Sequence, residues 1–195
     1  FFESIERIEI IACGTSKHAA MVGSFLLEQF SGIPTNVFYA SEFRYSPPPL
    51  LPNTLTIGVT QSGETADTIA AIDMEIKRRS SKEDKKFTPN LIAITNRKES
   101  SIGRQVLNII DICAGIEVGV AATKTFFGQL LSFYGLAIKF AQIKGTQSSD
   151  EVDKLITELI KLPPLIEDLL EQHNESSEKF CLLYTSPSPR DLARS

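Results

Sequence analysis

The chain has 195 residues, of which 42% are hydrophobic and 23% are charged, and its formal net charge is −4. This composition is that of an ordinary soluble globular protein with one full core, and the acidic balance argues against a nucleic-acid binder, which usually carries a basic face. No apolar stretch approaches the roughly 20 residues of a membrane-spanning helix, so we expect neither nucleic acid nor membrane as a partner.

Short β-branched segments alternate with longer amphipathic segments along the first 145 residues. Strands are predicted at residues 7–13, 35–39, 54–59, 90–95 and 109–113. Helices are predicted at residues 16–30, 66–79, 100–107 and 119–144. Hydrophobic strands that alternate with helices are typical of a parallel sheet covered on both faces. We therefore predict an α/β fold, a three-layer α/β/α sandwich with a five-stranded parallel sheet.

A basic run covers the end of the second predicted helix and the loop after it. Residues 77–86 include six basic and two acidic side chains. Such a run can bind a polyanion, but cations at a solvated helix end also suit the negative end of the helix dipole. We favour the second interpretation.

The composition changes after the last of these helices. We predict that residues 1–146 form one domain and that residues 147–180 form a connector helix leading into a truncated second domain. The helical pattern of the connector is interrupted by Pro163 and Pro164, because proline disrupts a helix interior. Residues 178–180 are expected to open a strand of the second domain.

The last segment, residues 181–195, reads CLLYTSPSPRDLARS and has no hydrophobic periodicity. It is rich in serine, proline and arginine. It resembles translated adapter or vector sequence joined to a truncated reading frame, so we expect no part of the fold there.

Cysteine and histidine usage argues against a metal centre. Cys13, Cys113 and Cys181 are widely spaced and form no CxxC or cysteine–histidine pattern. Reduced cysteines are typical of the cytosol, so we expect a cytoplasmic protein with neither a metal nor a cofactor. His18, in the first turn of a predicted helix, is assigned no catalytic role.

The first of three candidate ligand loops follows the first predicted strand. Such loops lie at the carboxyl ends of the strands, where open parallel sheets bind ligands. Gly14 permits a tight turn, and Ser16 is a candidate helix cap. A ligand-binding loop and a simple turn with a cap are equally compatible with these residues.

The second loop, residues 60–65, carries three hydroxyl side chains and one glycine between a buried strand and a helix start. Hydroxyls, exposed backbone amides and the helix N-terminus together suit a phosphate, and Gly63 permits close backbone approach. The alternative is that Ser62 or Thr65 caps the helix, which is compatible with phosphate binding. The loop has no lysine and no GxxxxGK[ST] pattern, and no GxGxxG follows the first strand, so a nucleotide site is not indicated.

The third loop, residues 117–125, meets the long apolar helix. Its small residues would let backbone amides face a ligand. Thr123 and Lys124 are either ligand groups or ordinary residues of the first helical turn. The residues alone favour helix capping.

Four segments in this order, CGTS, ASEFRY, QSGETADT and EVGVAATKTF, resemble the sugar isomerase (SIS) domain family. Within it, they resemble the first SIS domain of the glutamine–fructose-6-phosphate aminotransferases over roughly residues 5–180. The resemblance implies a flavodoxin-like fold and a site for fructose 6-phosphate or glucosamine 6-phosphate.

The resemblance places residues 60–65 around the phosphate, residues 15 and 16 beside the sugar, and part of the third loop near the sugar. Position 60 has threonine where serine is common, which keeps the hydroxyl, and position 122 has alanine where serine is common, which loses one. The predicted substrate-binding residues are Thr15, Ser16, Thr60, Gln61, Ser62, Gly63, Thr65, Val120 and Ala122.

The enzymes of this family make glucosamine 6-phosphate from fructose 6-phosphate and glutamine. The resemblance assigns their acid–base residues to a second SIS domain and a C-terminal tail, so we expect no catalytic residue in this chain and no activity of the chain alone. It also implies a homodimer formed through SIS domains, for which the helix from Gly119 offers one surface.

Two other functions compete with this one. A sugar-phosphate-sensing SIS domain of a transcription regulator would carry a basic helix-turn-helix before the domain, and the acidic sequence here contains none. A stand-alone phosphosugar isomerase is disfavoured by the ASEFRY segment and by the connector.

Overall fold

The computed structural model describes residues 2–118 and 122–185, and the side chains of these residues as far as residue 173. The chain divides into two compact units, one ending at Ser149 and the other beginning at Asp150. The candidate site lies in the first unit.

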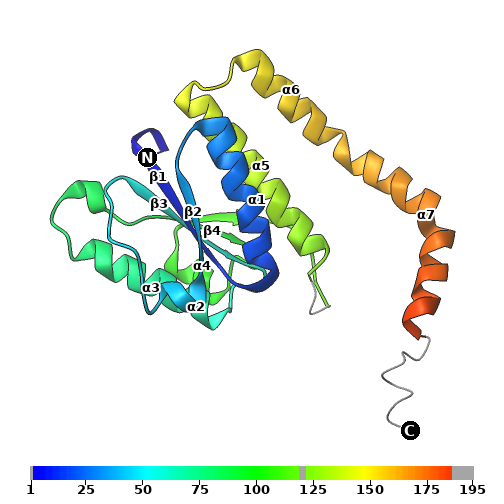
Figure 1. Ribbon diagram of the computed structural model, residues 1–195, viewed down its shortest axis with the longest axis horizontal. Helices are drawn as coiled ribbons and strands as arrows, with labels where there is room; N and C mark the ends of the chain where they lie inside the picture. The colour runs from blue at the N-terminus through cyan, green and yellow to red at the C-terminus, as the bar shows by residue number, and fades with distance from the viewer. Residues whose placement is uncertain (1, 119–121, 186–195) are drawn as a thin grey trace, which may run out of the picture. The chain divides into compact units, whose positions relative to one another are not determined.

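The first unit is built on five parallel strands in the order β2-β1-β3-β4-β5 (Figure 1). All five were predicted, with bounds within two residues of those observed, because each is a short run rich in β-branched and other apolar residues. The bounds are β1 Arg7–Ala12, β2 Thr35–Tyr39, β3 Thr54–Thr60, β4 Asn90–Thr95 and β5 Asn108–Asp111.

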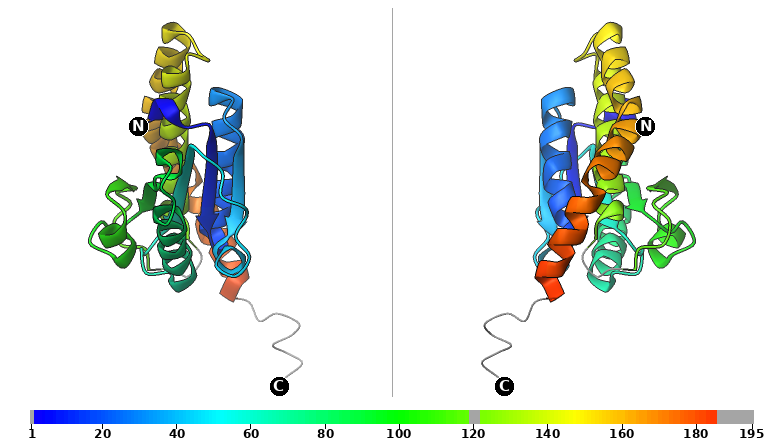
Figure 2. Two further views of the ribbon diagram at one scale, coloured as in Figure 1. Left: turned by 90° about the vertical axis from the view of Figure 1, so that its left-hand side faces the viewer. Right: turned by 90° about the vertical axis from the view of Figure 1, so that its right-hand side faces the viewer.

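Helices cover both faces of this sheet, as the side views in Figure 2 also show. The predicted three-layer sandwich is therefore confirmed, and the strand order is the flavodoxin-like one. One face carries α1 (Gly14–Ser31) and α5 (Lys124–Lys144). The other carries α2 (Ala40–Phe43), α3 (Ala66–Ser80) and α4 (Ser101–Gln105). The helix expected from residue 119 begins at Lys124, and the four-residue α2 was not predicted.

Helices α1 and α5 pack closely because one position on α1 has no side chain. A Cβ atom built on Gly23 would lie 2.4 Å from Cγ of Phe133 on α5. Phe133 is fully buried in the cluster that joins both helices to the sheet. A glycine at position 23 therefore makes room for this ring.

A cluster of buried charges joins α3 to β1. Arg79 Nε donates to Glu75 Oε1 over 2.6 Å, and Arg79 Nη2 lies 3.9 Å from Glu9 Oε2 on β1. Arg78 binds the other oxygen of Glu75 at 2.9 Å, and Arg79 Nη1 donates to the carbonyl of Leu51. The expectation of a solvated helix end is thus wrong for Arg79, which is buried against the sheet.

The described part of the second unit contains α6 (Ser149–Ile160), which begins at the boundary residue, and α7 (Leu162–Thr185). The break between them confirms the predicted interruption: Pro163 and Pro164 occupy the first turn of α7, where proline is tolerated. The strand expected at residues 178–180 is wrong, because these residues continue α7. Of the tail at residues 181–195, the first five also belong to α7, and residues 186–195 lie outside the described part.

The buried position of Glu9 predicts a pH-dependent stability. Burial raises the pKa of Glu9 above its ordinary value, the charge of Glu75 adds to this, and Arg79 opposes it. Stability from such a carboxyl is present below its unfolded pKa and is lost as the pH rises through the folded pKa. Glu9→Gln cannot titrate, so its free energy of unfolding relative to the wild type should increase with pH over a range that begins at the ordinary pKa of a glutamate.

Urea unfolding of both proteins across this range measures the difference. Glu6→Gln, at an exposed side chain just before β1, is the control. A Glu9→Gln difference that stays constant or shrinks with rising pH would contradict the assignment.

Candidate functional site

The site lies where the strand order reverses. The chain passes from β1 through α1 to β2 on one side, and β3 lies on the other side of β1. Ala12 pairs with Val59, so β1 and β3 end at nearly the same level. In such sheets ligands bind at the carboxyl ends of the strands at this switch point. The structure therefore brings the first and second predicted loops to one sheet edge.

The first loop turns at Gly14, whose φ of +53° lies in the left-handed region that glycine adopts readily. Because α1 already begins at Gly14, Ser16 lies within the first turn and is not the helix cap. The predicted cap is therefore wrong. Ser16 Oγ instead accepts a hydrogen bond from Nε2 of Gln129 on α5, at 2.9 Å. Thr15 lies half-buried in the same turn.

The hydroxyls of the second loop bind within the loop. Oγ1 of buried Thr60 lies 2.8 Å from Oγ1 of Thr65. Ser62 Oγ accepts a hydrogen bond from the backbone N–H of Glu64, at 3.1 Å. Among the described residues no side chain caps α3, although Thr65 occupies the N-cap position, so the capping expected of Ser62 or Thr65 is wrong. The first amides of α3 therefore have no side-chain acceptor, which suits an anion.

Position 63 favours glycine for two reasons, its backbone conformation and its close contact with a neighbouring side chain. Its φ is +70°, and a Cβ atom built on it would lie 1.9 Å from Ser100 Oγ. The Gly63 carbonyl accepts the N–H of Ile102, at 3.1 Å. The loop thus lies directly against the N-terminus of α4.

Two further contacts hold the second loop to its neighbours. The carbonyl of Gln61 accepts the N–H of Asn96, just after β4, at 3.1 Å. The carboxylate of Glu64 accepts the N–H of Ser101, at 2.8 Å. Hydrogen bonding to Ser101 lowers the pKa of Glu64, so the carboxylate stays charged at neutral pH. The loop conformation is therefore set by the β4–α4 segment.

The third loop is organised by Glu117. Its carboxylate accepts hydrogen bonds from the backbone N–H and the hydroxyl of Thr125, at 3.0 and 2.9 Å, and more weakly from both groups of Thr123. Hydrogen bonding to the backbone of Thr125, then to its hydroxyl, lowers the pKa of Glu117. Thr123 occupies the N-cap position of α5, but its side chain makes no capping hydrogen bond, so the capping expected of it is wrong. The acceptor at this helix start is Glu117, and exposed Lys124 is the first residue of α5.

The two residues of this loop that were predicted to bind the substrate are Val120 and Ala122. Ala122 is half-buried just before α5. Val120 lies outside the described residues.

A pocket of about 830 Å³ opens between the second and third loops. Known sites for small molecules commonly have volumes of about 300–1,000 Å³. No first-loop residue is among the described residues that line it, and Lys98 in its wall pairs with Asp111 at 3.3 Å. The lining residues are Gln61, Ser62, Asn96, Arg97, Lys98, Glu99, Asp111, Gly115, Ile116 and Glu117.

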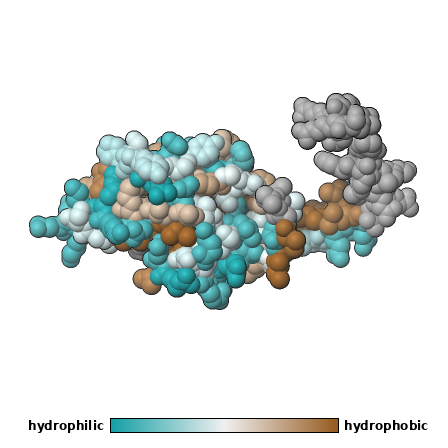
Figure 3. Space-filling model, turned by 90° about the horizontal axis from the view of Figure 1, so that it is seen from below, coloured by the Kyte–Doolittle hydropathy of each residue, from teal (hydrophilic) through white to brown (hydrophobic). Residues whose placement is uncertain are grey.

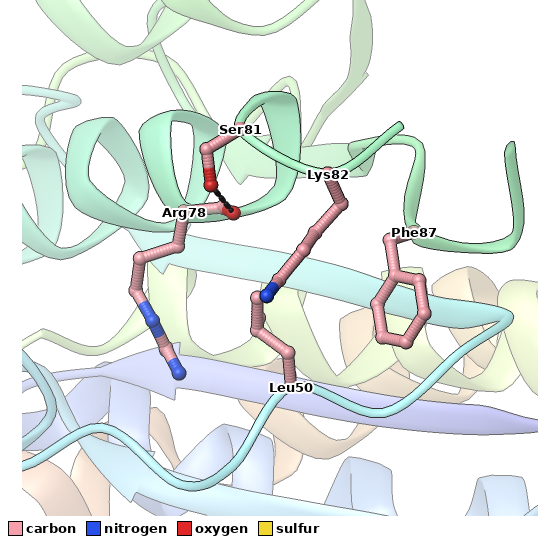
Figure 4. Close-up of a pocket in the computed structure, with 5 residues that line it drawn as sticks. All are labelled: Leu50, Arg78, Ser81, Lys82 and Phe87. Atoms are coloured by element: carbon pink, nitrogen blue, oxygen red, sulfur yellow. Dashed lines mark hydrogen bonds between the residues drawn. The ribbon is translucent and has the colours of Figure 1, made fainter. Parts of the chain in front are cut away.

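A second pocket of about 450 Å³ lies at the C-terminal end of α3 (Figure 4). Its walls include the aromatic ring of Phe87 and two cations, Arg78 and Lys82. Arg78 already binds Glu75 and the carbonyl of Pro48. The adjacent helix end is also the negative end of the dipole, so this pocket is a poor anion site.

Among the described side chains, those of residues 2–118 and 122–173, no group of three histidine, cysteine, aspartate or glutamate residues is placed to hold a metal ion. None of the described helices combines the length and the apolar character that crossing a membrane requires.

Comparison with known proteins places this geometry in a family. Residues 1–139 match the family model of the SIS domain. The chain belongs to the SIS domain family. Its sheet, switch point and loops are therefore those of a SIS domain.

Among individual proteins, the chain is 54% identical over 176 residues to the glutamine–fructose-6-phosphate aminotransferase (isomerizing) of Thermosynechococcus vestitus, covering 90% of this chain. It is 48% identical over 179 residues to the enzyme of the same name from Cyanidium caldarium. The chain spans 28% of the length of either relative, and 92% of the chain is covered in the second case.

Among solved structures, the C-terminal domain of glucosamine-fructose-6-phosphate aminotransferase from Francisella tularensis superposes with a TM-score of 0.80 at 31% identity. The match covers 89% of this chain and 47% of that one. A putative phosphosugar isomerase from Silicibacter pomeroyi gives a TM-score of 0.61 at 27% identity, covering 72% of this chain and 40% of that one. The similarity thus extends across the SIS domain.

Gly63 and Gly115 offer a matched test of the loop contact. Both have positive φ, but a Cβ on Gly115 would meet nothing within 4 Å. Gly63→Ala should therefore lower the free energy of unfolding by about 1–3 kcal/mol more than Gly115→Ala, the usual cost of overpacking. Urea denaturation measures both.

Ser100→Gly removes the two nearest atoms that a Cβ at position 63 would meet and leaves Thr95 Oγ1 at 3.2 Å, so it should recover part of the loss. Equal losses for the two alanine variants would show that Ser100 does not restrict this position.

Proposed function

We propose that this SIS domain binds the phosphate of fructose 6-phosphate through residues 60–65. We further propose that it does so as the substrate-binding part of a glutamine–fructose-6-phosphate aminotransferase, which forms glucosamine 6-phosphate. The observation that carries the proposal is the start of α3: its amides lack a side-chain cap beside the hydroxyls of Thr60, Ser62 and Thr65. A phosphate supplies the missing acceptors.

Hydrogen bonds within the loop leave protons for a phosphate. Ser62 Oγ is already an acceptor for Glu64 N–H, so its own O–H is available to donate outward. In the Thr60–Thr65 pair one hydroxyl donates to the other, and the second keeps its proton. Since Thr60 is the buried member, it orients Thr65, and Thr65 makes the outward contact. Threonine at position 60 preserves this arrangement.

The sugar is assigned to the other loops. Thr15 and Ser16 lie at the same sheet edge as the phosphate loop, and they contact the sugar in this proposal. Ala122, just before α5, belongs to the same contact in this proposal, and Val120 is assigned to it from the family resemblance alone. No residue of this chain is assigned acid–base chemistry, so turnover depends on other parts of the enzyme.

The domain organisation belongs to the same proposal. Residues 1–146 are the SIS domain, and residues 147–180 connect it to a second one. Cys13 and Cys113 are free, which supports a reducing, cytoplasmic location.

Ser62→Ala tests the phosphate loop. It removes a hydrogen bond to a charged group, worth about 1.5–3 kcal/mol. The dissociation constant for fructose 6-phosphate should therefore rise about tenfold or more. Titration calorimetry measures it, with Ser81→Ala in the pocket of Figure 4 as the control. Unchanged affinity in Ser62→Ala would refute the phosphate loop.

We also propose that two copies associate through α1 and α5. These adjacent helices expose several large apolar side chains, and hydrophobic residues also reach the surface seen in Figure 3. Burying such a surface against a second copy would remove apolar area from water. The exposed side chains are Met21, Val22, Phe25, Phe127 and Leu131.

Phe25→Glu tests this association, since Phe25 is 63% exposed and a carboxylate there would be buried in the dimer. Sedimentation equilibrium at micromolar concentration should give a dimer for the wild type and a monomer for Phe25→Glu. Leu107→Glu, a fully exposed position outside these helices, should remain dimeric. A monomeric wild type would overturn the proposed interface.

A further inference from the structure

One buried amide side chain reaches the first loop from a distant helix. Gln129 on α5 is 1% exposed, and its Nε2 donates to Ser16 Oγ across 113 positions of sequence. An amide buried without a partner is costly, so burial favours keeping this hydrogen bond. The bond therefore ties a loop residue to the interior of the domain.

Ser16 differs from the other serines of its helix. Ser24 donates to the carbonyl of Met21 and Ser31 to the carbonyl of Leu27, the usual arrangement for a helical serine. Ser16 accepts from Gln129 instead. Its hydroxyl proton is therefore left to donate to another group, which a hydroxyl can do while it accepts.

Gln129 is also connected to the third loop. It lies one helical turn beyond Thr125, on the same side of α5, and both residues are buried. Thr125 is bound by the carboxylate of Glu117. The start of α5 thus links the third loop at one residue and the first loop at the other.

We propose that Gln129 is a positioning residue for sugar binding. Its amide donates to Ser16 Oγ, fixes the rotation of that hydroxyl and directs its proton toward a hydroxyl of the sugar. This inference rests on the proposed function, in which Ser16 contacts the sugar and residues 60–65 hold the phosphate.

A double-mutant cycle tests the inference on this chain. Gln129→Met keeps the length of the side chain but cannot donate, and Ser16→Ala removes the contact. Each variant should weaken fructose 6-phosphate binding about three- to tenfold, the effect of one neutral hydrogen bond. The double variant should bind no more weakly than Ser16→Ala alone, because Gln129 acts through Ser16.

The affinity for inorganic phosphate separates a lost sugar contact from general damage to the fold, because damage to the fold would weaken phosphate binding as well. Its affinity should be the same in the wild type, Gln129→Met and Ser16→Ala, because only the sugar contact is lost. Ser132→Ala, on α5 and bonded only to its own helix, is the control for fructose 6-phosphate binding. If Gln129→Met does not fold, Gln129→Asn, which is one methylene too short to reach Ser16, takes its place.

The outcomes separate this inference from the proposed function. Losses that add in the double variant, or full affinity in Gln129→Met while Ser16→Ala is impaired, would overturn the role of Gln129. Full affinity in both Ser16→Ala and Ser62→Ala would overturn the proposed site itself. If Ser16→Ala keeps full affinity while Ser62→Ala loses affinity, the proposed phosphate loop stands. The sugar contact of Ser16 and the positioning role of Gln129 would then both be refuted.

Discussion

The parallel pairing of β1 with β3 determines where the rest of the site lies. Backbone hydrogen bonds between the two central strands hold Ala12 opposite Val59, so their loops leave the sheet at one level. The chain then turns to opposite sides, through α1 and α3. Two helix starts therefore meet at one edge, each with unpaired amides near it. A loss of this register would separate the two loops, whatever their residues.

Given that register, the first two loops are shaped by groups remote in sequence, and the third by a residue of its own. Ser100 and Ile102 hold Gly63, Glu117 holds the start of α5, and Gln129 holds Ser16. In each case a hydrogen bond or close contact restricts a group that would otherwise rotate freely. Hydroxyls that already accept a bond have fewer orientations left, so less conformational entropy is lost when a ligand binds.

The sequence was sufficient for the strands and for locating the second loop between β3 and α3, because both follow from local patterns such as β-branched runs and turn residues. It was misleading for the caps. Ser16 and Thr65 looked like caps, but Ser16 binds Gln129, 113 residues away, and Thr65 binds Thr60 within its own loop. Glu117 was missed because it acts across six to eight residues, while a capping box spans three. The strand predicted at residues 178–180 was wrong, because three residues are too few to show whether apolar positions repeat as in a strand or as in a helix.

The buried charges on α3 determine where this helix packs along the sheet. A purely apolar interface would let α3 slide along the sheet by one turn, about 5.4 Å, at modest cost. Here such a slip would move Arg79 away from Glu9 and from the carbonyl of Leu51, and would strand charge in the core. The buried charge cluster therefore fixes the position of α3 along its own axis relative to the sheet. By fixing one end of α3, it sets how far the opposite end projects at the ligand edge.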